Sequence, residues 1–282
     1  MTIHRIINSI LWRLEKLCAG PRLRLFKTLY INLRTLPFSQ AIKFPLLIYG
    51  HVKFYNLSGQ IEIKGSIRRG MIKFGYRQGD FSGPKRCAML LLAPGTKLIF
   101  HGPCMFDHDY AIRITGHGMV DIGAYIGFGS DTKIYCEESI TIGDYCRIPF
   151  GSCFMDTNYH YSINTIDGTV HRKSASISIG CYNWIGNTST IMKGTRTPDG
   201  SIIASKSFLN KDYTKLSDSE PYIVLAGSPA KIVQHHATRV LSLEVEQHLN
   251  RWFDANPTEK TYSDIHLLER YTDTSGYNKL FK

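Results

Sequence analysis

An aliphatic residue returns every six positions between residues 120 and 212, and this spacing constrains the fold more than any other feature of the sequence. Twelve positions follow the repeat, with one slip of two residues and one longer break, and eleven of them are Ile, Leu or Phe. The positions are Ile122, Phe128, Ile134, Ile142, Ile148, Phe154, Ile179, Ile185, Ile191, Thr197, Ile203 and Leu209. Only 43% of the chain is hydrophobic, so the run is too regular to be a product of composition.

A period of six fits neither a helix, which repeats near 3.6 residues, nor an ordinary strand, which repeats at 2. It fits a coil of short strands joined by tight corners, in which each strand sends one side chain inward onto the coil before. If each inward side chain contributes about 1.5–3 kcal/mol on burial, a dozen of them can hold such a solenoid together. A β-sandwich with coincidental spacing is the alternative.

Corner residues directly follow the repeat positions. Glycine, which lacks a Cβ, and proline, which is common in turns, are both favoured where the chain bends sharply. The residues concerned are Gly123, Gly129, Gly143, Gly180, Gly186, Pro149 and Pro198. The pattern therefore predicts a solenoid through positions 122–209.

Three phrases in this region resemble the hexapeptide-repeat acyltransferases, and among them the sugar and polysaccharide O-acetyltransferases. They are IGDYCRIPFGSCFMDTNYH, IGCYNWIGNTSTIMKGTRTPDGSIIASKSFLNKD and AGSPAKIV, and the likeness covers residues 112–233. The resemblance implies a left-handed parallel β-helix, homotrimers, acetyl-CoA as the donor, and active sites between subunits. The cysteine and histidine patterns described below give no reason to expect a metal.

The expected fold is therefore all-β: a left-handed parallel β-helix with helical appendages at both ends. Residues 1–45 are expected to form a basic amphipathic helical segment, residues 46–233 the β-helix, and residues 234–282 a C-terminal helical extension. Within the β-helix we expect irregular coils to about residue 111 and regular ones after it. Helices are predicted at 237–254 and near 262–270.

A polar stretch at 156–176 interrupts the repeat and is predicted to be an extruded loop. It holds turn residues and no inward aliphatic position. A loop of this length within a repeat array is more often functional than idle. The catalytic residue is therefore sought at its edge.

The charge of the chain is concentrated at its start. The net charge is +11, and residues 1–73 alone hold thirteen Lys and Arg against two acids. An apolar stripe with Trp12 beside it marks an amphipathic helix, formed by Ile3, Ile6, Ile7, Ile10, Leu14 and Leu17. Such a helix can lie in an anionic membrane interface or can cap the solenoid, and the two alternatives are compatible.

The chain is expected in the cytoplasm, with contact to the inner face of the membrane through residues 1–35 as an open alternative. No run of about 18 apolar residues and no signal peptide is evident. Seven cysteines, an odd number without a CxxC pair, suit a reducing compartment better than disulfides or a metal site. No nucleic-acid partner is expected.

Acetyl transfer to a hydroxyl needs a base for the hydroxyl proton, and a neutral imidazole with a pKa of about 6.5 suits this task. His160 stands six residues after Phe154, where the chain leaves the coil for the loop. The resemblance places the catalytic histidine of the family at this position. Cys153 is an alternative nucleophile, although its place beside Phe154 favours a structural role.

The acceptor is expected near the same loop. Asp156 is a candidate to orient the imidazole or bind an acceptor hydroxyl, with a turn-forming role as the alternative, and Asn158 has the same two interpretations. The resemblance aligns Glu137 with an acceptor-binding carboxylate. The companion asparagine of the family is replaced here by Gly129, so the acceptor of this chain can differ from a small free sugar.

The donor is expected on the last coils. The resemblance implies that the pantetheine arm of the coenzyme lies between two neighbouring β-helices, along the phrase that contains Trp184. The expected donor-binding residues are Trp184, Gly186, Asn187, Ser205, Lys206, Lys211 and Lys231, with the lysines as candidates for the nucleotide phosphates. Ala204, Ser205 and Lys206 are bulkier than the glycine and alanine of the family.

The predicted function is direct O-acetyl transfer from acetyl-CoA to a saccharide, in the biosynthesis of a surface polysaccharide or its precursor. A serine or xenobiotic acetyltransferase and a non-catalytic glycan-binding scaffold are the alternatives. A zinc enzyme similar to the γ-class carbonic anhydrases would need three convergent histidines. The spacing of His101, His108, His117 and His171 lacks the close pair that such a site uses.

Overall fold

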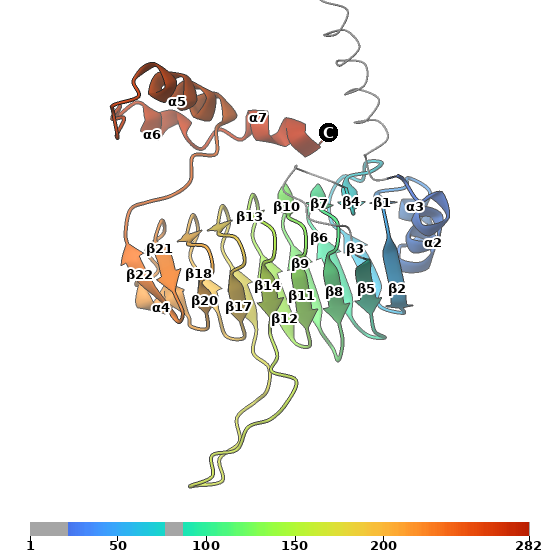
Figure 1. Cartoon of the computed structure of the whole chain (residues 1–282). Helices are drawn as coiled ribbons and strands as arrows, with labels where there is room; N and C mark the ends of the chain where they lie inside the picture. The colour runs from blue at the N-terminus through green and yellow to red at the C-terminus, as the bar shows by residue number, and fades with distance from the viewer. Residues whose placement is uncertain (1–21, 77–86, 282) are drawn as a thin grey trace, which may run out of the picture.

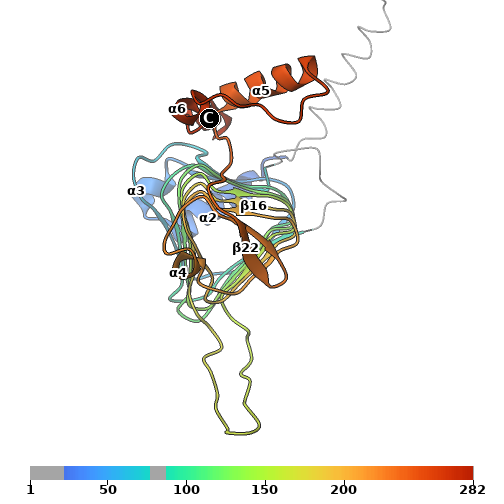
Figure 2. The same cartoon turned by 90° about the vertical axis from the view of Figure 1, so that its left-hand side faces the viewer.

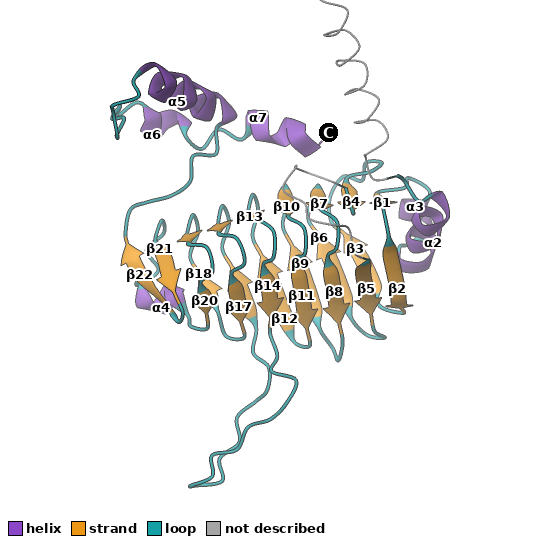
Figure 3. Ribbon diagram, in the orientation of Figure 1, coloured by secondary structure: helices purple, strands orange, loops and turns teal. Residues whose placement is uncertain are grey.

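The computed structural model describes residues 22–76 and 87–281. Its strands lie between Leu46 and Gln234 and form a three-sided parallel β-helix, seen from the side in Figure 1 and along its axis in Figure 2. The front strands in Figure 1 run downward while successive coils step from right to left, so the coil is left-handed. The predicted fold class, with helices at both ends, is confirmed (Figure 3).

Three sheets make the three sides, and through β20 every third strand belongs to the same sheet. The first sheet contains β1 (Leu46–Ile48), β4 (Ile72–Phe74), β7 (Cys104–Phe106), β10 (Ile126–Phe128), β13 (Arg147–Ile148), β16 (Trp184–Ile185), β19 (Ile202–Ile203), β21 (Val224–Gly227) and β22 (Ala230–Gln234). The second contains β2 (Val52–Leu57), β5 (Ala88–Leu92), β8 (Ala111–Ile114), β11 (Lys133–Cys136), β14 (Cys153–Met155), β17 (Thr190–Met192) and β20 (Phe208–Leu209). The third contains β3 (Gln60–Ile63), β6 (Lys97–Phe100), β9 (Met119–Ile122), β12 (Ser139–Ile142), β15 (Ile177–Ile179) and β18 (Arg196–Thr197).

The repeat positions form the interior of the coil. All twelve, including Thr197, are at most 3% exposed, which confirms the inward assignment. Successive coils align these residues directly: Ile134 pairs with Phe154, and Phe154 with Ile191, along the second sheet. The buried side chains of successive coils belong to one continuous hydrophobic core that runs through the solenoid.

The glycines after the repeat positions are required because the coils approach each other closely. A Cβ added to Gly186 would lie 2.3 Å from the backbone nitrogen of Ser205, and one added to Gly143 would lie 2.5 Å from that of Cys181. Larger residues take the positive-φ corner positions instead, and Tyr125, with φ of 59°, is an example. The predicted corners are therefore correct, and their glycines serve close stacking.

The early coils, from β1 to β8, stack in the same three sheets although their sequence pattern is loose. Leu46 pairs with Ile72, and Ile72 with Cys104, in parallel register. Aromatic rings replace the aliphatic residues inside: Phe74 stacks on Phe106 at 5.0 Å, and Phe106 on Phe128 at 4.3 Å between ring centroids. Mixed residue types at the inward positions explain why a strict period of six is hard to see here.

The N-terminal end of the coil is covered by α2 (Leu25–Thr35), followed by α3 (Phe38–Ala41). The side chain of Asn32 donates to the carbonyl of Leu46 at 2.8 Å, and the hydroxyl of Thr28 accepts from the backbone N–H of Ile48 at 3.0 Å. These bonds satisfy the open edge of β1, which would otherwise expose unpaired backbone groups. The part of the N-terminal segment predicted at residues 1–21 lies outside the described residues.

The C-terminal segment folds back over the solenoid (Figure 1). After the antiparallel pair β21–β22, it forms α5 (Leu243–Ala255), α6 (Leu267–Arg270), α7 (Ser275–Asn278) and a 3-10 helix, η1 (Lys279–Phe281). A short helix, α4 (Tyr213–Leu216), precedes that pair. Every helix of residues 22–76 and 87–281 is too short or too polar to cross a membrane.

We predict that Ile134→Ala destabilises the fold by about 2–5 kcal/mol, because it removes one side chain from the buried stack and leaves a cavity. Ile166→Ala is the matched control, since Ile166 is 95% exposed, and it should change the free energy of unfolding by less than about 0.5 kcal/mol. Urea unfolding followed by circular dichroism measures both. Equal effects of the two substitutions would contradict the inward assignment.

Candidate functional site

The loop between β14 and β15 is a hairpin that projects away from the coil, as Figure 1 shows at the bottom of the molecule. Isolated antiparallel bridges join Thr157 to Ser174 and Ile163 to Val170. The coil continues across the interruption without a shift, because Ile140 in β12 pairs with Ile177 in β15. The hairpin is therefore an insertion at one corner, and its base is fixed by the coils on both sides.

A cluster of polar side chains lies where the hairpin leaves the coil; we call it the loop-base cluster, and it consists of Arg113, Glu137, Thr157, Tyr159 and Lys173. Glu137 Oε2 accepts from the hydroxyl of Thr157 at 2.9 Å and lies 2.8 Å from Lys173 Nζ. The hydrogen bond from Lys173, with a smaller contribution from Thr157, lowers the pKa of Glu137 below its ordinary value. Glu137 is therefore held as a carboxylate that ties both arms of the hairpin to the coil beneath.

Asp156 is fully buried at the start of the hairpin. Its carboxylate accepts the backbone N–H of Glu137 at 2.8 Å and of Glu138 at 2.9 Å, and the thiol of Cys136 at 3.2 Å. These donors belong to the corner one coil earlier. The arrangement matches the turn-forming alternative for Asp156, since the carboxylate organises the backbone under the loop.

His160 is exposed and stands three residues after Thr157, the last buried residue at the start of the hairpin. Its backbone N–H donates to the carbonyl of Asn158 at 2.7 Å, and Tyr159 between them has a φ of 58°. The guanidinium of Arg113 lies 5.4 Å from the centre of the Tyr159 ring, close enough for a cation–π contact. The tight turn therefore fixes the backbone of His160 within the base of the hairpin, and His160 is exposed to solvent. Asn158 is exposed as well, and its N–H donates to the carbonyl of Lys173 at 2.9 Å.

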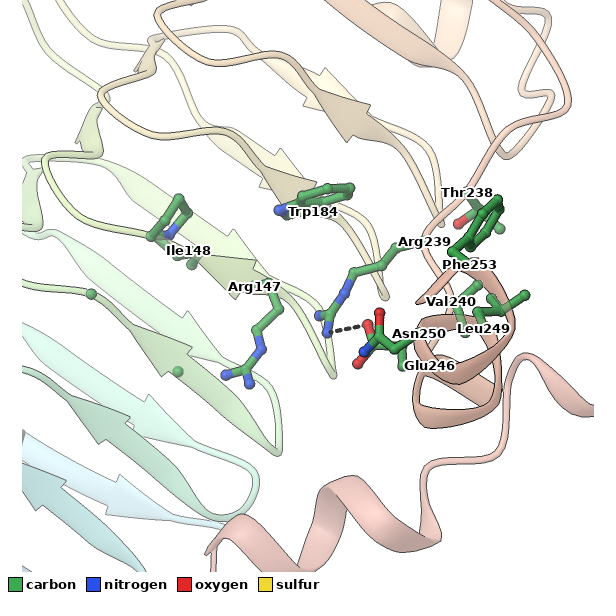
Figure 4. Close-up of a pocket in the computed structure, with 13 residues that line it drawn as sticks. Arg147, Ile148, Trp184, Thr238, Arg239, Val240, Glu246, Leu249, Asn250 and Phe253 are labelled. Atoms are coloured by element: carbon green, nitrogen blue, oxygen red, sulfur yellow. Dashed lines mark ion pairs between the residues drawn. The ribbon is translucent and has the colours of Figure 1, made fainter. Parts of the chain in front are cut away.

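Trp184 lies in β16 of the first sheet, whereas the hairpin leaves the corner between the second and third sheets. The indole is 44% exposed and lines a cavity of about 780 Å³ between the first sheet and α5 (Figure 4). In one subunit, His160 and Trp184 therefore lie on different sides of the three-sided coil.

The Trp184 cavity carries two arginines beside its apolar wall. Arg239 lies 3.7 Å from Glu246, as the dashed line in Figure 4 marks, and both residues line the cavity from the C-terminal segment. Arg147 lies over the ring of Tyr277 at 4.5 Å, and burial lowers its pKa. The predictions from sequence missed these residues, because their meeting depends on how the C-terminal helices fold back.

The predicted donor residues fall into two sets. Trp184, Gly186, Asn187, Ser205 and Lys206 lie on two consecutive coils, and the N–H of Lys206 donates to the carbonyl of Asn187 at 2.9 Å. The second set consists of Lys211 and Lys231, which lie at other places on the coil. Lys211 follows β20 at the corner towards the third sheet, and Lys231 lies in β22, paired with Ala226.

Lys173, Arg113 and Tyr159 were also missed in the sequence. Tyr159 could have been suggested by its place beside His160 in the chain, whereas Arg113 lies two coils before β14 and Lys173 lies on the opposite arm of the hairpin. Cys153 lies in β14, where burial raises the pKa of its thiol. A raised pKa disfavours the thiolate, which is the nucleophilic form.

Comparison with known proteins supports the sequence resemblance, although no protein-family model matches the chain. A chloramphenicol acetyltransferase of Morganella morganii is 32% identical over 98 residues, which cover 34% of this chain and 42% of that protein. A second, from Klebsiella aerogenes, is 25% identical over 157 residues, covering 49% of this chain and 69% of that protein. The chain is similar to acetyltransferases. The predicted resemblance is thereby confirmed, although the chain spans less than half of the first relative.

Among solved structures, the polySia specific acetyltransferase NeuO aligns with a TM-score of 0.45 and 19% identity. The alignment covers 76% of this chain and 99% of that one.

We predict that Lys173→Ala raises the pKa of Glu137 towards the ordinary value of 4.5, because the substitution removes the largest cause of its lowering. Carboxyl ¹³C chemical shifts followed through a pH titration measure this. The contribution of the pair to stability should be present above pH 4.5 and be lost as the pH falls through the lowered pKa of Glu137.

Lys193→Ala is the control, since Lys193 Nζ binds the carbonyl of Arg172 at 2.7 Å near the same hairpin. It should leave the titration of Glu137 unchanged. An unchanged pKa in Lys173→Ala would show that the loop-base cluster is not held as described.

Proposed function

We propose that the protein is an O-acetyltransferase that moves an acetyl group from acetyl-CoA to a hydroxyl of a saccharide, in a surface polysaccharide or its precursor. One observation carries the proposal: an exposed histidine stands where a β-helix similar to acetyltransferases extrudes a hairpin with a fixed polar base. A base held at a defined place is what acyl transfer to a hydroxyl requires.

In the proposed reaction His160 is the general base. The acceptor oxygen attacks the thioester carbonyl while the imidazole takes the hydroxyl proton. The tetrahedral intermediate then collapses, the carbon–sulfur bond breaks, and the imidazolium returns the proton to the leaving thiolate. The raised pKa of Cys153 supports direct transfer over an acyl-enzyme, because a protonated thiol is a poor nucleophile.

The donor in this proposal lies along Trp184, Gly186, Asn187, Ser205 and Lys206, with the indole as an apolar wall for the pantetheine arm. Lys206 offers a cation to the nucleotide phosphates. Lys211 follows β20 at the corner towards the third sheet, so it would reach the same coenzyme only from a neighbouring subunit. Lys231 lies in β22 of the first sheet, which also contains Trp184.

We further propose that the active site forms between subunits of a homotrimer. The separation of His160 and Trp184 on one subunit supports this, because no rotation of a side chain brings them together. The exposed hairpin, with Ile166 95% exposed at its tip, is suited to reach a neighbouring copy. Assembly of the trimer would then bring His160 of one subunit next to the donor-binding residues of another.

A saccharide suits the loop-base cluster because the groups around the hairpin base are hydrogen-bonding and charged. Glu137, Thr157 and Lys173 present such groups, and Asn158 adds an exposed amide. A xenobiotic acceptor is the second candidate, since the relatives from Morganella morganii and Klebsiella aerogenes are named chloramphenicol acetyltransferases. A drug-like acceptor calls for a more apolar pocket than these residues provide.

We predict that His160→Ala lowers the rate of acetyl transfer by about 10²–10⁴-fold, as expected for loss of a general base. The release of free coenzyme A thiol, measured with a panel of oligosaccharides and chloramphenicol, reports both rate and acceptor class. Faster turnover of chloramphenicol than of any saccharide would favour the second candidate.

Cys153→Ser is the control for mechanism and should retain most of the activity, because Cys153 takes no covalent part in direct transfer. Loss of turnover in this variant with intact coenzyme binding would instead require an acyl-enzyme. Full activity of His160→Ala would overturn the assignment of the base.

A further inference from the structure

Helix α2 packs on the coil with its more polar side. The buried residues on that side are Thr28, Ile31, Asn32 and Thr35, and Thr28 and Asn32 bind the edge of β1. The opposite side is apolar and points away from the coil: Phe26 is 90% exposed and Leu25 is 70% exposed. The amphipathic helix is thus turned outward, with its hydrophobic stripe unused by the described fold.

The same surface continues onto α3 and the turn after it, where Phe38 is 73% exposed and Ile42 is 55% exposed. We define the N-terminal face as the exposed apolar residues Leu25, Phe26, Leu29, Leu33, Phe38 and Ile42. It lies at the extreme end of the coil, beside β1 and β2 in Figure 1. Apolar residues exposed together on two helices that contact each other mark an interaction site.

The Asp, Glu, Lys and Arg residues in the sequence around the N-terminal face are all basic. No Asp or Glu occurs between Glu15 and Glu62. The basic residues of the described part of this stretch are Arg22, Arg24, Lys27, Arg34, Lys43 and Lys53. Lys27 binds the carbonyl of Val52, and its ammonium also lies 5.7 Å from the Phe54 ring. Exposed apolar residues in a stretch of sequence whose Asp, Glu, Lys and Arg content is entirely basic match the interface of an anionic bilayer. There, acyl chains take the apolar side and lipid phosphates the basic side.

We propose that the N-terminal face docks on an anionic membrane surface. The amphipathic pattern of Ile3 to Leu17, with Trp12, lies just before it in the sequence and adds the same chemistry to the same end of the chain. Because the face lies at one end of the coil, docking would leave the axis of the β-helix pointing outward from the membrane surface.

The distance from the membrane to the hairpin follows from the strand spacing. β2 and β14 are four strands apart in the second sheet, which corresponds to about 19 Å along the axis. The thickness of α2 adds about 10 Å. His160 would therefore act about 30 Å above the bilayer, within reach of a saccharide attached to a lipid carrier.

In the proposed trimer the three parallel coils carry their N-terminal faces on the same side. This part rests on the proposed function, because it requires the homotrimer. Three N-terminal faces, each of modest affinity, would then bind the same membrane. Once one face is bound, the other two are held at a high effective concentration, which raises the apparent affinity of the trimer for the membrane.

The test is co-sedimentation of the full-length protein with vesicles of phosphatidylcholine containing 30% phosphatidylglycerol, and with vesicles of phosphatidylcholine alone. We expect binding to the anionic vesicles and a decrease of about tenfold or more in partitioning for Phe26→Ser combined with Phe38→Ser. Arg34→Glu combined with Lys43→Glu should weaken binding by about tenfold or more and make it less sensitive to salt.

Two controls keep the test specific. Ile265→Ser combined with Leu268→Ser changes two exposed apolar residues of the C-terminal segment, 72% and 65% exposed, and should leave binding unchanged. Acetyl transfer to a soluble acceptor should be unchanged in all these variants, which separates failure of docking from failure of the proposed function. Circular dichroism verifies folding.

The proposal is overturned if the wild-type protein does not sediment with anionic vesicles, or if the Phe26 and Phe38 variant binds as well as wild type. It is also overturned if that variant changes the sedimentation-velocity mass instead of vesicle binding, since the face would then contact a second copy. Equal binding to neutral and anionic vesicles would contradict the role of the basic residues.

Discussion

The structure depends on the close, in-register stacking of one coil on the next. Each coil places a side chain from every strand on the side chain one coil earlier, as Ile134, Phe154 and Ile191 illustrate. The backbones approach so closely at the corners that Gly186 has no room for a Cβ against Ser205. Because every contact repeats along the axis, a coil is stable only when its neighbours are in place.

The same constraint leaves the outside of the coil free to vary. Ile142 and Ile179 are 37 positions apart in the sequence, and they still pair although the hairpin lies between them. A corner can therefore extrude a long segment at little cost to the core, and buried Asp156 ties the backbone at the exit to the coil beneath. The rigid coil thus holds the backbone of His160 at a defined place although its side chain is exposed.

The sequence predicted the interior because inward positions obey one period, and all twelve assigned residues are buried. It predicted the place of His160, where the chain leaves the coil, from the spacing after Phe154. The catalytic role of His160 stays a prediction from the family resemblance, since a single histidine has no periodic signature. The partners of Asp156 could not be predicted, because they are backbone N–H groups about twenty residues away. The Trp184 cavity could not be predicted from the sequence either. Arg239 and Glu246 come to line it together with Arg147 only after the C-terminal helices fold back over the first sheet.

The proposed chemistry requires the base of one subunit and the donor wall of another, because His160 and Trp184 lie on different sides of one coil. Co-assembly of two inactive variants tests this requirement most directly. His160→Ala and Trp184→Ala subunits, carrying different affinity tags, are co-expressed and purified as mixed assemblies through both tags. We predict that each variant alone is inactive and that mixed assemblies recover acetyl transfer, because some interfaces pair an intact His160 with an intact Trp184. Mixed assemblies as inactive as either parent would contradict a site shared between subunits.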